Sequence, residues 1–85
     1  MALSMDVELF GVAVPNVYHR VTGVQQQRLG ERNLVEYTLY KDSSATQLFE
    51  IRTRAFPYEN INGDVAAWAY TQLKTLPEFA GAVDV

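Results

Sequence analysis

The sequence predicts an α+β domain in which a three- to four-stranded antiparallel β-meander carries one C-terminal α-helix packed on one face. Three observations support this class. Segments of alternating apolar and polar residues are separated by turn residues, as in antiparallel sheets. The period becomes helical after Asp64. The length of 85 residues suits one hydrophobic core, so we expect a single domain spanning residues 1–85.

Turn residues delimit four candidate strands, at residues 7–14, 17–28, 34–41 and 47–56. Pro15 and Asn16 are expected to separate the first two, and Gly23 is expected to mark a bulge or a close backbone approach within the second. Alternation places one set of side chains toward the helix, and this set comprises Val35, Tyr37, Leu39, Phe49, Ile51, Thr53 and Ala55.

The helix is expected to begin after Asp64, whose carboxylate can accept hydrogen bonds from free backbone N–H groups. Val65, Ala69, Leu73 and Leu76 recur at helical spacing and form one apolar stripe. Trp68 lies at the edge of that stripe, which favours a place in the core. Pro77 should end the helix after about three turns.

The uncovered face of the sheet is the candidate interaction surface. Tyrosine and arginine are enriched in the cores of protein interfaces. The pattern places both types on this face and predicts a protein interface at Tyr18, Arg20, Tyr40, Arg52, Arg54 and Phe56. Two alternatives stay open. The N-terminal segment could fold over this face, and the charged residues could form cross-strand pairs with Glu36 and Glu50.

No residue pattern predicts catalysis, so we expect a protein that is not an enzyme, with no cofactor and no small-molecule substrate. His19 is the sole histidine, there is no cysteine, and the carboxylates are scattered. A catalytic triad needs a nucleophile and an orienting group beside the histidine, a metal site needs several ligands at set spacings, and a glycosidase-like site needs two carboxylates close together. Residues 60–64 resemble the start of a calcium loop but lack its closing glutamate, so we interpret them as a turn and helix cap.

The charge distribution argues against nucleic acid as a partner. The formal net charge is −3, and the seven lysine and arginine residues form no concentrated patch. No run approaches the length of a membrane span, and the N-terminus lacks the pattern of a signal peptide. We therefore expect neither membrane nor nucleic-acid binding.

Two segments resemble a known group of proteins. Residues 15–21 read PNVYHRV and residues 69–84 read AYTQLKTLPEFAGAVD. They are similar to the opening and closing segments of small proteins encoded among the tail structural genes of tailed bacteriophages and prophages. The middle strands are unmatched, and the family carries no catalytic residues. The resemblance implies a virion component of the tail tip, baseplate or fibre-attachment region.

The expected function is therefore that of a non-enzymatic structural part of a phage virion, made in the bacterial host cytoplasm. Its partners would be other virion proteins or copies of itself. A tail assembly chaperone absent from the mature particle is the first alternative, and a small phage regulatory protein is the second. A hydrolase is the weakest reading, because no nucleophile has a base beside it.

Overall fold

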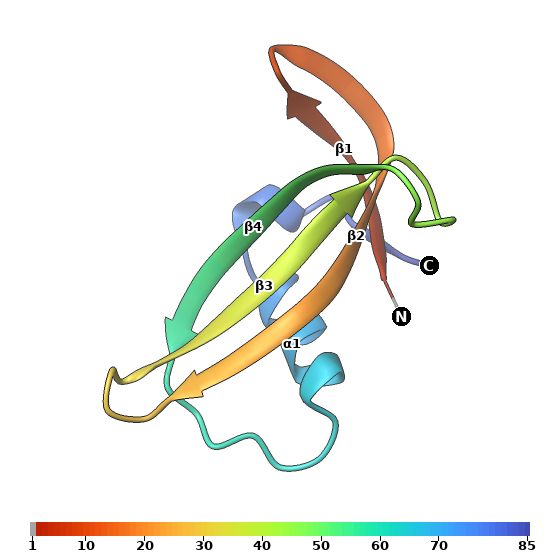
Figure 1. Cartoon of the computed structure of the whole chain (residues 1–85). Coiled ribbons are helices and arrows are strands. Elements are labelled where there is room, and N and C mark those ends of the chain that lie inside the picture. The colour runs from red at the N-terminus through yellow and green to blue at the C-terminus, as the bar shows by residue number, and fades with distance from the viewer. Residues whose placement is uncertain (1) are drawn as a thin grey trace.

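The computed structural model describes residues 2–85 and has the expected α+β class, with an antiparallel sheet and one α-helix (Figure 1). The sheet has five strands in the order β4-β3-β2-β1-β5, where the sequence predicted three or four. The elements are β1 (Leu3–Leu9), β2 (Val12–Gln27), β3 (Arg32–Tyr40), β4 (Leu48–Pro57), α1 (Val65–Leu73), the 3-10 helix η1 (Pro77–Phe79) and β5 (Val83–Asp84).

The first strand predicted from the sequence, residues 7–14, is wrong, because it contains a hairpin turn. Leu9 pairs with Val12, and Phe10 and Gly11 form the two-residue connection between β1 and β2. Pro15 and Asn16 do not interrupt β2. They form a bulge opposite Asp6, whose Oδ1 accepts a hydrogen bond of 3.0 Å from the Asn16 N–H. A bulge accommodates proline because an unpaired residue needs no ladder hydrogen bond.

The predicted bulge at Gly23 is confirmed. The register of β2 on β3 shifts between Val21, which faces Tyr37, and Gly23, which faces Glu36. The bulge adds one residue to β2, so beyond it the side chains of β2 alternate between the two faces of the sheet in the opposite order. Val24 therefore lies with Val35 and packs against the core.

The predicted helix start is confirmed, because the Asp64 carboxylate accepts a hydrogen bond of 3.1 Å from the Ala67 N–H. The helix ends at Leu73 instead of continuing to Leu76. Leu76 has an extended conformation, which is the conformation that a following proline imposes. Pro77 then begins η1, and β5 returns the chain to the margin of the sheet beside β1.

The core lies between one face of the sheet and the segment formed by α1 and η1. Its buried members come from β1, β2, β3, β4, α1 and η1, and they include Leu3, Leu9, Val17, Val35, Tyr37, Leu39, Phe56, Ala69, Tyr70, Leu73 and Phe79. Figure 1 shows α1 and η1 behind the sheet. We call the sheet surface that faces this core the helix face, and the opposite surface the open face.

Candidate protein-interaction surface

The open face carries three of the six predicted interface residues. Tyr18 lies opposite Tyr40 across β2 and β3, and their ring centroids are 6.4 Å apart in a tilted arrangement. Arg20 is the next residue along this face and lies opposite Thr38. Arg20 is exposed and forms no ion pair within residues 2–85, so its guanidinium is available to a partner.

The expected placement of Arg52, Arg54 and Phe56 on the open face is wrong. In β4 these residues lie opposite Tyr37, Val35 and Asn33, which all belong to the helix face. Phe56 is buried there against Trp68, with ring centroids 6.2 Å apart. Residues predicted to point inward are on the open face instead: Ile51, Thr53 and Ala55 lie opposite Thr38, Glu36 and Leu34, and Ile51 is more than half exposed.

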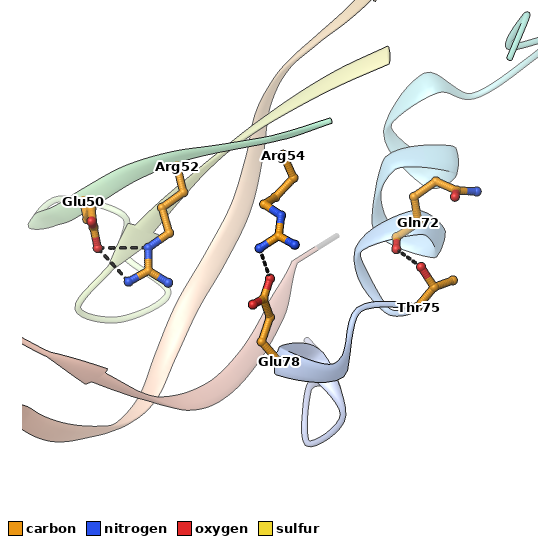
Figure 2. A network of polar contacts seen from close by, with 6 residues as sticks. All are labelled: Glu50, Arg52, Arg54, Gln72, Thr75 and Glu78. Atoms are coloured by element: carbon orange, nitrogen blue, oxygen red, sulfur yellow. Dashed lines mark hydrogen bonds and ion pairs between the residues drawn. The ribbon is translucent and has the colours of Figure 1, made fainter. Parts of the chain in front are cut away.

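Both arginines of β4 already have carboxylate partners at the margin of the helix face (Figure 2). Arg52 contacts Glu50 on the same strand, with 2.8 Å between the guanidinium and the carboxylate. Arg54 contacts Glu78 of η1. Arg52 and Arg54 lie on an edge strand, and their long side chains keep the guanidinium groups in contact with solvent. These two arginines can therefore lie on the helix face without burying a charge. The predicted cross-strand pairs on the open face do not form.

The polar centre of the open face is a hydroxyl network. Thr38 is buried, and its hydroxyl lies 3.1 Å from that of Thr22. The Thr22 hydroxyl is also 3.0 Å from a Glu36 carboxylate oxygen. Beside this network lies an open hollow of about 290 Å³ lined by Gln25, Leu34 and Thr53 among others. The face thus combines aromatic, aliphatic and hydrogen-bonding groups.

The N-terminal segment does not cover the open face, so this alternative is wrong. β1 lies in the plane of the sheet and pairs with β2 from Leu3 to Leu9. Its outer edge pairs with β5 at Leu3 and Ser4. Because β1 extends the sheet sideways, the surface around Tyr18 and Tyr40 remains accessible.

His19 is a core residue. Its ring is fully buried, stacks on Tyr37 at 6.1 Å and meets the edge of Phe79 at 5.6 Å. Nδ1 lies 2.9 Å from the Val17 carbonyl oxygen, and Nε2 has no hydrogen-bond partner within residues 2–85. Burial lowers the pKa of His19 and keeps the imidazole neutral. Within residues 2–85, the only hydrogen bond of this ring is to the Val17 backbone.

Two buried tyrosines, Tyr37 of β3 and Tyr70 of α1, also stay neutral. Burial raises the pKa of Tyr70, although the hydrogen bond from the Val21 N–H to its hydroxyl oxygen, at 2.9 Å, opposes that shift. Burial likewise raises the pKa of Tyr37. Within residues 2–85, no group of three or more histidine and carboxylate side chains is placed to hold a metal ion. No helix there is long and apolar enough to cross a membrane.

Comparison with known proteins yields no match to a protein-family model, a curated protein or a solved structure. The bacteriophage resemblance of the two end segments therefore stays a prediction. The structure brings those segments together. The Val21 N–H donates to the Tyr70 hydroxyl, and the ring of His19 contacts that of Phe79.

Proposed function

We propose that this chain is a non-enzymatic structural component of a tailed-bacteriophage virion, associated with the tail, and that it acts through protein–protein contacts. The observation that carries the proposal is the paired resemblance of residues 15–21 and 69–84 to small tail-gene products. Those segments hold Val17, His19, Tyr70 and Phe79, which are buried together in one core. The resemblance therefore favours a shared fold with those proteins.

The arrangement that we propose for this role is a meander of β1 to β4 with α1 on one face and a binding surface on the other. Ala69, Tyr70 and Leu73 of α1 belong to the same buried cluster as Val35 and Tyr37, which supports that arrangement. The open face is then free to contact neighbouring virion proteins. We now assign the surface to Tyr18, Arg20, Tyr40 and Ile51, since Arg52, Arg54 and Phe56 lie on the helix face.

The first test is quantitative mass spectrometry of gradient-purified particles from the phage or prophage that encodes the chain. A fixed copy number per particle is the expected result. Absence from particles, with the protein abundant in the producing cells, would replace the proposal with the assembly-chaperone role. Absence from both particles and assembly intermediates would reject both roles.

The surface assignment has its own test. Arg20→Glu reverses the charge of an exposed side chain that has no ion pair within residues 2–85, so the fold should be unaffected. We expect this variant to reduce incorporation into particles. The matched control is Arg28→Glu, which makes the same change at an exposed position between β2 and β3. Equal incorporation of both variants would rule out the open face around Arg20 as the contact.

A further inference from the structure

The outer half of the β1–β2 hairpin, residues 6–16, extends beyond the rest of the sheet, and we call it the arm. β2 joins β3 only from Tyr18 onward, and β1 joins β5 only at Leu3 and Ser4. Within residues 2–85 the arm therefore has two unpaired edges. Figure 1 shows it rising from one end of the sheet. A two-stranded ribbon is only marginally stable in water, so a third strand would stabilise the arm.

The tip of the arm has an unfavourable residue for its turn. Phe10 and Gly11 have φ angles of +53° and +77°, which match a type I′ hairpin turn. Positive φ strains a bulky residue, and asparagine is preferred at the first position of this turn. The Phe10 side chain is also 88% exposed, and Val12 beside it is 62% exposed. Strain and exposure at one aromatic residue are both explained if the ring binds another molecule.

The arm is acidic. Asp6 and Glu8 are exposed, and residues 6–16 contain no lysine or arginine. Charge complementarity therefore favours a recipient surface that is apolar and bordered by basic side chains. It should also present free backbone groups, because the arm has unpaired strand edges.

The edge of β4 has these properties. β4 is the outermost strand of the sheet. Just beyond the end of β4, the Tyr58 N–H donates to the Glu31 carbonyl, next to the start of β3. In an antiparallel ladder, every second residue of β4 before Tyr58 therefore directs its backbone N–H and C=O groups toward β3. The intervening residues must then direct their N–H groups outward, and they are Ile51, Thr53 and Ala55. Pro57, the next in this series, has no N–H group, which suits an edge.

Side chains along the same edge match the arm in polarity and charge. Ile51 is 55% exposed and Leu48 is 53% exposed. Arg52 and Arg54 lie between the outward-facing residues. Each already contacts a carboxylate, that of Glu50 or Glu78, but their side chains remain 35% and 40% exposed, so an acidic arm would share these arginines with their present partners. We propose that the arm of one copy of this chain docks on the β4 edge of a second copy, with Phe10 as its apolar anchor.

Such a contact is head-to-tail, because the arm and the β4 edge are different surfaces of one chain. Repetition of a head-to-tail contact produces a closed ring or an open filament. The inference concerns the purified chain and does not rest on the proposed virion role, so either can fail without the other.

The first test compares Phe10→Asn with the wild type by sedimentation velocity across the micromolar to millimolar range. We expect wild-type self-association and at least about tenfold weaker association in the variant, the loss of one anchor residue. The melting temperature of the variant monomer should be unchanged or higher, because Asn-Gly suits the turn. Leu29→Asn is the matched control, since Leu29 is fully exposed in the β2–β3 turn. A monomeric wild type, or equal association in Phe10→Asn, would overturn the proposal.

The second test establishes polarity by mixing two variants. Ile51→Glu places a carboxylate on the β4 edge, where it repels the acidic arm, and Thr53→Glu is the replacement if that variant folds poorly. At a concentration where the wild type associates, each variant alone should sediment mainly as a monomer. A mixture of Phe10→Asn with the edge variant should give one heterodimer, because one chain keeps a working edge and the other a working arm. A mixture that remains monomeric would refute the head-to-tail contact.

Discussion

The buried His19 ring should make the stability of this domain depend on pH, and acidification is the perturbation. The ring is fully buried between Tyr37 and Phe79, and its Nε2 has no hydrogen-bond partner within residues 2–85. Burial lowers the pKa of His19 below its ordinary 6.5, and the Arg52 charge acts in the same direction. The Val17 carbonyl opposes the lowering of the pKa, and the Leu3 backbone opposes it more weakly. The Leu3 backbone forms no hydrogen bond of normal geometry with Nε2.

The sign follows from the depressed pKa in the folded state. Well above pH 6.5 the ring is neutral in both the folded and the unfolded state, and His19 takes nothing from the free energy of unfolding. As the pH falls from 6.5 toward the lower folded pKa, the unfolded chain binds a proton that the folded chain does not. The free energy of unfolding then falls with a slope that approaches about 1.4 kcal/mol per pH unit. Domains are stable by only about 5–15 kcal/mol, so one or two pH units are measurable.

The assay is urea denaturation at closely spaced pH values from neutrality down to the range where carboxylates begin to titrate. His19 is the only histidine, so few other groups change charge in this interval. His19→Phe keeps a buried aromatic ring without a titrating group and should abolish the slope, whatever its effect on absolute stability. The reasoning is refuted if the wild-type free energy is flat over this interval, or if wild type and variant share one slope.

Two further predictions concern the core and the helix start. Leu73→Ala removes a fully buried α1 side chain and should lower the free energy of unfolding by about 2–5 kcal/mol in urea denaturation. Leu48→Ala, at a position more than half exposed, should change it by no more than about 0.5 kcal/mol. Asp64→Ala removes the carboxylate that accepts from the Ala67 N–H and should cost about 1 kcal/mol, whereas Asp64→Asn should largely preserve stability. Equal effects of both Asp64 variants would contradict the capping argument.

The features predictable from the sequence are those set by local chemistry. The Asp64 cap needs only a carboxylate before a helical period, and it forms as expected. Gly23 signals a bulge because it interrupts an alternating strand, and the register shifts there. The alternation of Val35, Tyr37 and Leu39 is likewise confirmed, since all three are buried. Each of these signals lies within a few residues of the structure that it specifies.

The β1–β2 hairpin was not predictable in the same way, because its turn has unusual residues. A type I′ turn is normally marked by Asn-Gly or Asp-Gly. Phe10-Gly11 within an apolar run instead looked like the middle of a strand. Pro15-Asn16 looked like a break, but the left-handed Asn16, with φ of +54°, allows a bulge within a continuous strand. The short β5 was also missed, since two residues carry no periodic pattern.

The error at the candidate site has a different origin, because β4 is apolar on both faces. Phe49 and Ile51 suggested one inward face, but only Phe49 packs against the core, together with Phe56, whereas Ile51 lies on the open face. The register shifts between Leu39 and Tyr40 of β3, with Phe49 as the extra β4 residue. Only tertiary contacts select the face: Trp68 packs on Phe56, and Glu78 receives Arg54. Local alternation contains neither partner.

The same bulge limits how β4 can pair with another chain. Together with Pro57 at the opposite end, it confines the regular outward-facing N–H groups to Ile51, Thr53 and Ala55. Bulges, proline and charge on an edge normally protect sheets from indiscriminate association. A window this short provides few backbone hydrogen bonds, and each contributes only about 0.5–1.5 kcal/mol net. Specific docking at this edge would therefore depend on side chains, above all on an exposed aromatic anchor. This is why Phe10, and not the length of the paired strands, should decide whether two copies associate.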